Sequence, residues 1–114
     1  MSFHENLQAK IDAYTHLVYK VSKSFPKEEQ FGITSQLRRS SLSVALNYIE
    51  GYARVRSKVH KNFLQIAYGS LKESKYLIEF SHAEQLIPKK EYEELKTLAD
   101  EIGAMLWSIL KNMK

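Results

Sequence analysis

The sequence predicts an all-α fold, an antiparallel up-down-up-down four-helix bundle in which residues 1–114 form a single domain. Three observations lead to this fold class. Apolar residues recur every three or four positions over long segments, as they do on one face of a helix. No segment alternates apolar and polar residues in the manner of a strand. The two prolines, Pro26 and Pro88, fall between the periodic segments.

The first predicted helix carries one apolar stripe and ends at Pro26, because proline lacks the backbone N–H that a continuing helix needs. Its stripe consists of Leu7, Ile11, Tyr14, Val18, Val21 and Phe25. Two proline-free segments, residues 33–55 and 57–83, predict the second and third helices. A fourth helix is predicted after Pro88, with its stripe at Leu95, Leu98, Ile102, Met105, Ile109 and Met113. Short connections between long helices favour antiparallel neighbours.

The second predicted helix has more apolar surface than one core requires. On a helical wheel its apolar residues cover roughly 200°, whereas a surface helix needs about 100°. A monomer would leave part of this surface exposed, and exposed apolar patches mark interfaces. We therefore predict a homo-oligomer. The residues predicted to form its interface are Arg38, Leu42, Leu46, Tyr48, Ile49 and Tyr52.

A narrow polar stripe on the same helix predicts a structural network. Glu50 and Arg54 are spaced to pair at i,i+4, and Asn47 can reach the Glu50 carboxylate at i,i+3. We interpret Asn47, Glu50 and Gly51 as residues that orient the helix against its neighbours; a ligand site is the alternative. Glycine inside a helix costs about 0.5–1 kcal/mol relative to alanine, so we expect close packing or a helix end at Gly51.

The third predicted helix has an apolar face and a basic face. Its predicted core face consists of Val59, Phe63, Ile66, Ala67, Ser70, Leu71, Ser74, Leu77 and Ile78. Its opposite face consists of Lys58, Lys61, Gln65, Tyr68, Lys72, Lys75 and Tyr76. Lysines interleaved with tyrosines suit phosphates and stacked bases, and they equally suit a solvated face whose tyrosines pack on lysine stems.

The net charge of +4 is concentrated in one part of the chain. Residues 38–61 contain six basic residues and a single acidic one, Glu50, whereas the rest of the chain is nearly balanced. A local excess of this kind attracts polyanions, although a solvated helix end with nothing bound has the same composition. The residues predicted to bind nucleic acid are Arg39, Arg54, Arg56, Lys58 and Lys61.

The sequence argues against an enzyme. It has no cysteine, and its four glycines stand alone, so it offers neither a thiol nucleophile nor a phosphate-binding glycine loop. Glu79 and His82 have the spacing of a di-iron ligand pair, but the fourth predicted helix has no histidine to complete that site. We predict no cofactor and no metal. The start of the chain does not read as a signal peptide, and no apolar run has the length of a membrane span, so we predict a cytoplasmic protein.

Three motifs resemble one family of small bacterial proteins. They are FPKEEQFGITSQLRRSS at residues 25–41, Asn-x-x-Glu-Gly at residues 47–51 and NFLQIAYGSLKES at residues 62–74. Over about residues 7–110 the chain resembles the four-helix bundle proteins encoded by intervening sequences of bacterial 23S ribosomal RNA genes. The resemblance implies an antiparallel four-helix bundle that assembles as a ring, commonly a pentamer. It also implies an architecture similar to the accessory variability proteins of diversity-generating retroelements, which bind nucleic acid and a reverse transcriptase.

One departure from the family pattern lies in the second helix. Family members read Ser-Ile-Pro-Ser-Asn-Ile-Ala-Glu-Gly where this chain has SVALNYIEG at residues 43–51. Ala45 in place of the proline restores a backbone donor, which predicts a straighter helix.

Two functional hypotheses follow. In the first, the protein is a nucleic-acid-binding oligomer whose basic residues, repeated by symmetry, grip phosphates without reading sequence. In the second, it is a structural or adaptor oligomer that docks a protein partner and does not bind nucleic acid. The position of Arg38 bears on this choice, because a buried or interfacial Arg38 would belong to assembly and could not also meet phosphate.

Overall fold

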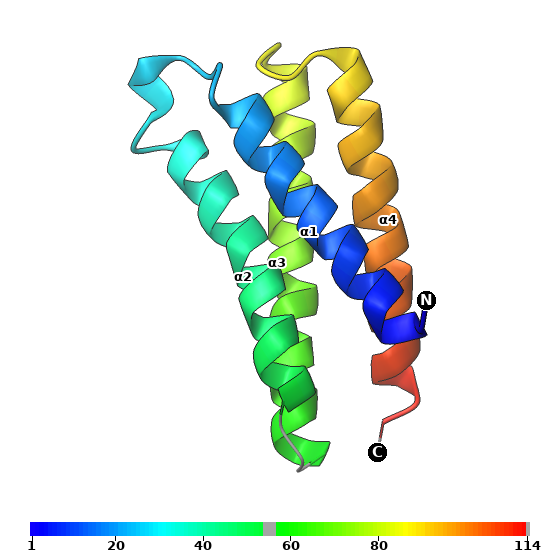
Figure 1. Ribbon diagram of the computed structural model, residues 1–114. Coiled ribbons are helices and arrows are strands. Elements are labelled where there is room, and N and C mark those ends of the chain that lie inside the picture. The colour runs from blue at the N-terminus through cyan, green and yellow to red at the C-terminus, as the bar shows by residue number, and fades with distance from the viewer. Residues whose placement is uncertain (54–56, 114) are drawn as a thin grey trace.

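A computed structural model describes residues 1–53 and 57–113, and these residues form four α-helices (Figure 1). The helices are α1 (Phe3–Ser22), α2 (Ile33–Ala53), α3 (Ser57–Ala83) and α4 (Lys89–Lys111), with a 3-10 turn, η1 (Lys27–Glu29), between α1 and α2. None of the described residues lies in a strand. The predicted all-α four-helix bundle is confirmed, and α3 has the predicted bounds.

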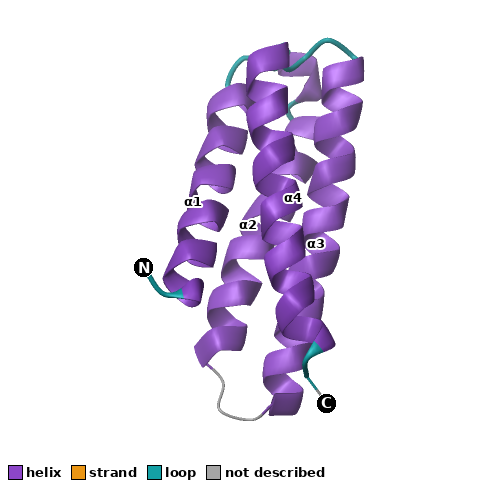
Figure 2. Cartoon of the chain, turned by 90° about the vertical axis from the view of Figure 1, so that its right-hand side faces the viewer, coloured by secondary structure: helices purple, strands orange, loops and turns teal. Residues whose placement is uncertain are grey.

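Each helix packs against two others: α1 and α3 both contact α2 and α4. Successive helices run antiparallel along an elongated bundle of 43 × 26 × 19 Å (Figure 2). The end of α2, the start of α3 and the end of α4 therefore share one end of the bundle, as Figure 1 shows. The opposite end carries the end of α1, η1 and the start of α2. This arrangement decides which charged side chains can act together.

Local sequence signals explain where the helices begin and end. At the start of α1, the Glu5 N–H donates to Ser2 Oγ at 3.1 Å and the Ser2 N–H donates to Glu5 Oε1 at 3.0 Å. The hydrogen bond that the Glu5 carboxyl accepts from the Ser2 N–H lowers the pKa of this carboxyl. Helix α1 ends three residues before Phe25, which is still buried because the chain turns back toward the core there. Helix α2 continues through Ala45 without interruption.

One hydrophobic core runs along the bundle. Helix α1 contributes the predicted stripe from Leu7 to Val21, and Phe25, beyond the end of α1, is also in the core. The core face predicted for α3 is wrong in part: Leu64 is fully buried, whereas Ile66 is 51% exposed. Some apolar residues of α3 lie outside its core face. A face predicted from all the apolar residues is therefore centred too far toward the solvent. The α4 face is also rotated slightly from the predicted stripe. Its buried residues are Leu95, Ala99, Ile102, Leu106 and Leu110.

Helices α2 and α3 approach each other closely along a seam of small and polar residues. A Cβ atom added at Gly51 would lie 3.1 Å from Phe63 Cβ and 3.3 Å from the His60 carbonyl oxygen. Further along the seam, Ser43 Oγ and Ser70 Oγ share a hydrogen bond of 2.7 Å. The close packing predicted at Gly51 is therefore confirmed, and glycine is needed there for space.

The predicted polar network has a different geometry. Asn47 Nδ2 donates to the Ser43 carbonyl oxygen at 2.9 Å and to Ser43 Oγ at 3.0 Å, so its amide supports the seam through Ser43 instead of reaching Glu50. Arg54, the predicted partner of Glu50, lies outside the described residues. Asn47 thus has Ser43 as its partner, and its role in orienting α2 against the neighbouring helices stays a prediction.

The N-terminus of α1 is clamped to the end of α2 by aromatic residues. His4 Nδ1 and the Tyr48 hydroxyl are 2.7 Å apart, and the His4 ring stacks on Tyr52 at 3.4 Å between ring centres. Tyr48 is only 2% exposed, so its prediction as an oligomer-interface residue is wrong. Tyr48 lies on the core face of α2. The apolar arc predicted on the helical wheel was so wide that it included both this core face and the exposed outer face. Burial, with Tyr52 close by, raises the pKa of Tyr48 to about 12.

We predict opposite effects on stability for alanine at two helical glycines. Gly51→Ala forces the new Cβ against Phe63 and the His60 carbonyl, and the strain should exceed the gain in helix propensity, for a net loss of about 1–2 kcal/mol. Gly69→Ala is the matched control, because a Cβ at Gly69 meets no atom within 4 Å. Gly69→Ala should gain about 0.5–1 kcal/mol. Urea denaturation measures both, and equal stability of the two variants would contradict the close α2–α3 packing.

We also predict that Tyr48 contributes to alkaline unfolding. Its pKa is about 12 in the folded chain against a usual value of 10, so its contribution is complete below pH 10 and is lost as the pH rises toward 12. In Tyr48→Phe the free energy of unfolding should therefore decrease by about 2–3 kcal/mol less than in the wild type between pH 10 and pH 12. Free energies of unfolding at a series of pH values test this. Equal alkaline slopes for wild type and Tyr48→Phe would refute the prediction.

Candidate nucleic-acid interface

The fold separates the residues that the sequence predicted to bind nucleic acid. Lys58 and Lys61 lie in the first turns of α3, and Arg39 is exposed in the first half of α2. The contacts between Ser43 and Ser70 and between Gly51 and Phe63 fix the antiparallel register. In this register Arg39 lies roughly 20 Å along the bundle from Lys61, at 1.5 Å per residue. Arg39 therefore does not join the cluster at the start of α3.

Arg54 and Arg56 lie outside the described residues. In the sequence they stand directly before α3, within four residues of Lys58. Of the five predicted nucleic-acid residues, the structure therefore places Lys58 and Lys61 at one end of the bundle and Arg39 elsewhere.

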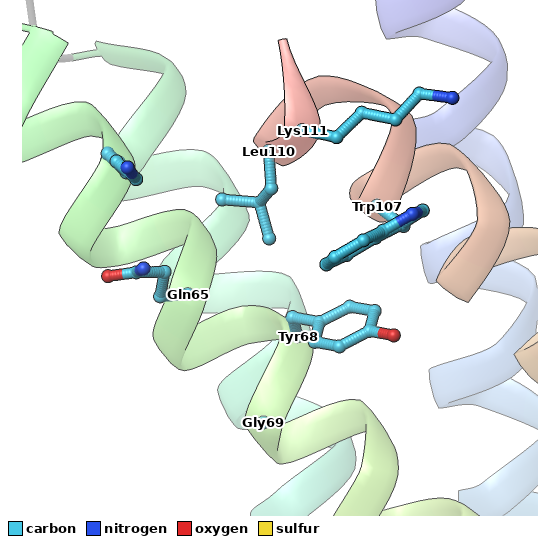
Figure 3. Close-up of a pocket in the computed structure, with 7 residues that line it drawn as sticks. Gln65, Tyr68, Gly69, Trp107, Leu110 and Lys111 are labelled. Carbon is cyan, nitrogen blue, oxygen red and sulfur yellow. The ribbon is translucent and has the colours of Figure 1, made fainter. Parts of the chain in front are cut away.

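A hollow between α3 and α4 opens at the same end as Lys61 (Figure 3). Its volume is about 410 Å³. It is lined by Lys61, Gln65, Tyr68, Gly69, Trp107, Leu110 and Lys111, and we call it the aromatic hollow. Figure 3 shows the Trp107 and Tyr68 rings side by side, with Leu110 facing them. The ring centres are 6.0 Å apart with 36° between the planes, and Trp107 is 54% exposed.

The surroundings of the aromatic hollow are basic. Lys61 and Lys111 line it from opposite helices, and Lys72 Nζ lies 5.2 Å from the centre of the Tyr68 ring, in cation–π range. Residues 57–72 of α3 and 102–111 of α4, which lie toward this end of the bundle, contain no aspartate or glutamate. Positive charge here is therefore not offset by carboxylates on the same segments.

The basic face predicted for α3 is only partly available to a ligand. Lys61, Gln65 and Tyr68 line the aromatic hollow, but Lys75 Nζ lies 2.6 Å from Asp100 Oδ1 of α4. The bond to this carboxylate raises the pKa of Lys75. Lys75 thus serves the α3–α4 contact, and the end of α3 nearer its N-terminus keeps the free lysines.

The sequence did not identify Trp107, Leu110 and Lys111 as site residues. Leu110 faces the hollow while it also packs on the core, and Trp107 stands off the predicted apolar stripe of the fourth helix. The one sequence signal for this site was Trp107, which lies outside the predicted apolar stripe and has Lys111 four residues later. Its meaning depended on the neighbouring helix, because only the α3–α4 register brings Tyr68 against Trp107.

The exposed apolar residues of α2 form a second feature of the surface. Leu42, Leu46 and Ile49 follow at spacings of four and three on the side of α2 away from the core, and Leu46 is 59% exposed. Tyr52 is exposed at the edge of this stripe, with one ring face covered by His4. Arg38 is only half-buried, and its guanidinium turns toward α1 instead of the stripe.

No group of three or more histidine, cysteine, aspartate or glutamate side chains gathers in a metal-binding arrangement among the described residues. The His82 ring of the Glu79-x-x-His82 motif is instead placed by structural contacts. Its Nδ1 lies 3.0 Å from the Ile87 carbonyl oxygen, and the ring stacks on Tyr92 at 4.0 Å. Within the part of the chain that the structure describes, no helix combines the length and apolarity needed to cross a membrane.

Comparison with known proteins places the chain in a family. The profile of the 23S rRNA-intervening sequence proteins matches residues 6–108. The chain belongs to the 23S rRNA-intervening sequence protein family. A search of curated proteins finds no match. Among solved structures, a protein of unknown function from the S23 ribosomal protein family of Bacteroides thetaiotaomicron superposes with a TM-score of 0.85. Its sequence is 23% identical, and the alignment covers 93% of this chain and 99% of the other.

The match to the 23S rRNA-intervening sequence proteins confirms the resemblance that the three motifs indicated. The similarity to the Bacteroides protein supports the fold alone at this level of identity. Neither comparison names a catalytic family. The role of this family member must therefore be argued from its surface.

Proposed function

We propose that this 23S rRNA-intervening sequence protein is a non-enzymatic cytoplasmic oligomer that binds single-stranded nucleic acid without sequence readout. The observation that carries the proposal is the aromatic hollow, in which an exposed tryptophan and a tyrosine lie between two lysines. Proteins that bind single strands combine aromatic platforms for bases with basic side chains for the backbone.

The rings supply the stacking surface. Every base has a flat π-face, so Trp107 can stack any base, which favours binding that tolerates all sequences. The Trp107 and Tyr68 planes are tilted by 36° instead of lying parallel, and about half of the Trp107 surface is exposed to solvent. Besides the Tyr68 hydroxyl and the Trp107 N–H of the stacking rings, Gln65 supplies the one uncharged polar group in the lining, which offers few groups to read base edges.

The lysines supply the phosphate contacts. Lys61 and Lys111 flank the rings, with Lys58 in the preceding turn of α3. Arg54 and Arg56, which stand just before α3 in the sequence, are proposed as further phosphate contacts. Each phosphate contact made by a single strand lowers the slope of log affinity against log salt by about 0.7. Arg39 is too far along the bundle to share these phosphates.

The proposed oligomer is assembled by the outer stripe of α2. Leu42, Leu46 and Ile49 are exposed in one chain, although leucine and isoleucine are residues that proteins normally bury. A second copy packed on the stripe would cover them. A pentamer is the assembly that the family resemblance implies, and it would repeat the basic end of the bundle by symmetry.

The proposed nucleic-acid binding can be tested at Trp107, which is the only tryptophan in the chain. Binding of an oligo(dT) or oligo(rU) strand should quench its fluorescence, because a stacked base contacts the indole directly. Trp107→Ala should weaken binding about tenfold, since one stacked base contributes about 1–3 kcal/mol. Trp107→Phe should retain most of the affinity. Anisotropy of the labelled strand across a salt series measures the affinity and its salt dependence.

The matched control is Phe80→Ala, which removes an exposed aromatic ring from α3 outside the aromatic hollow. It should leave binding unchanged. Equal losses in Trp107→Ala and Phe80→Ala, or binding without a change in tryptophan fluorescence, would exclude the aromatic hollow. No binding at low salt would reject the nucleic-acid proposal and leave the adaptor hypothesis, in which the protein docks a protein partner.

The proposed assembly can be tested separately. Leu46→Lys places a charge in the proposed interface, so the mass measured by light scattering should fall to that of one chain or a smaller assembly. Ala104→Lys, at an exposed position of α4, is the control and should keep the native mass. Both variants should keep the native helical circular dichroism. An unchanged mass for Leu46→Lys would place the interface elsewhere.

A further inference from the structure

A second hollow lies at the opposite end of the bundle and has no part in the proposed function. It opens where α1 ends and α2 begins, and its volume is about 410 Å³. It is lined by Ser22, Lys23, Phe25, Pro26, Lys27, Gln30, Thr34 and Arg38, and we call it the basic hollow. Where the aromatic hollow offers rings, most of these residues offer polar or charged side chains.

The charge in the basic hollow has one sign. Lys23, Lys27 and Arg38 line it, and no carboxylate does. Glu28 and Glu29 are adjacent in η1 but are not part of the lining. No described carboxylate lies within ion-pair distance of these three cations. Three uncompensated cations around one concave surface favour an anionic ligand.

Arg38 is held in a geometry that leaves its outer nitrogens available. Its Nε donates to Ser22 Oγ at 2.8 Å, and its guanidinium carbon lies 4.6 Å from the centre of the Tyr19 ring. Ser22 in turn donates to the Tyr19 carbonyl oxygen at 3.2 Å, so the acceptor is fixed as well. No described residue accepts from the two terminal nitrogens of Arg38. A guanidinium oriented in this way can bind two oxygens of one phosphate.

Thr34 provides an independent sign of a missing partner. Its side chain is 9% exposed and lines the basic hollow, and its Oγ1 is buried without a hydrogen-bond partner. A buried hydroxyl without a partner has lost its hydrogen bonds to water and gained none in return, so such groups are uncommon in folded proteins. Thr34 also lies in the first turn of α2, where the helix dipole adds positive potential.

We propose that the basic hollow binds a phosphate group in its dianionic form, a phosphomonoester or terminal phosphate. Arg38 grips two oxygens, Thr34 donates to one oxygen, and Lys23 and Lys27 balance the charge. Three cations match a dianion better than the single charge of a backbone phosphodiester. The site does not depend on the aromatic hollow, which lies at the other end of the bundle, between the start of α3 and the end of α4.

The test is a titration of the ¹⁵N-labelled protein with inorganic phosphate. The pH is held above the second pKa of phosphoric acid, so that the dianion predominates, and chloride keeps the ionic strength constant. The amide signals of Thr34 and Ser35 should shift and saturate together. Arg38→Gln and Lys27→Ala should each weaken phosphate binding about tenfold. Lys27 is exposed, so Lys27→Ala keeps the fold even if the Arg38 variant does not.

Two further variants sharpen the result. Thr34→Val keeps the shape of the side chain and removes an unpartnered hydroxyl, so it should preserve stability and weaken phosphate binding by about threefold. Lys90→Ala removes one exposed positive charge outside the hollow and should leave binding unchanged. Shifts that do not saturate, unchanged affinity in Thr34→Val, or equal losses in Lys27→Ala and Lys90→Ala would overturn the proposal.

The source of the phosphate is separated by two further probes. If the ligand is the end of a nucleic acid strand, a 5′-phosphorylated oligonucleotide should bind more tightly than its 5′-hydroxyl form, and Arg38→Gln should abolish the difference. If the ligand is a small phosphorylated compound, inorganic phosphate should bind while the two oligonucleotides bind equally. Trp107→Ala should retain the phosphate response in either case, so failure of this site and failure of the aromatic hollow are distinguishable.

Discussion

The close approach of α2 and α3 at Gly51 sets the register on which the surface of the protein depends. With Phe63 and the His60 carbonyl so close to Gly51, neither helix can slide by a turn without bringing a side chain into that contact. The hydrogen bond between Ser43 and Ser70 maintains the same register two turns away. Small residues along this seam therefore determine which residues of α3 face α4, and with them the position of Tyr68 against Trp107.

The antiparallel order then sorts charge by bundle end. One end collects the acid-free residues 57–72 of α3 and 102–111 of α4, with the Tyr68 and Trp107 rings between their lysines. The other end brings Lys23, Lys27 and Arg38 together from α1, η1 and α2 around a polar hollow. The two hollows suit different parts of a nucleotide, because flat rings favour bases and a fixed guanidinium favours phosphate. A modest net charge thus gives two chemically distinct surfaces.

The sequence predicted the fold well because the features that determine it are local. Helical periodicity and the positions of Pro26 and Pro88 identified four helices, and the cost of a helical glycine indicated close packing at Gly51. Predictions that depended on contacts between helices were less successful. Tyr48 and Ile66 are both apolar, yet one is buried and the other exposed, since the exact rotation of each helix comes from its neighbours. Trp107 and Lys111 could not be assigned to a site before the α3–α4 register was known.

Arg38 shows how a single contact changes the interpretation of a residue. On the helical wheel it falls within the apolar arc of α2, which favoured a place in the oligomer interface. In the structure Ser22 and Tyr19 of the same chain hold its guanidinium, away from the stripe of Leu42, Leu46 and Ile49. Helix α1, which supplies the acceptor for Nε and the ring beside the guanidinium, therefore favours the proposed phosphate site over the oligomer interface for Arg38. Assembly and phosphate binding can then occupy different sides of one helix without competing for the same side chain.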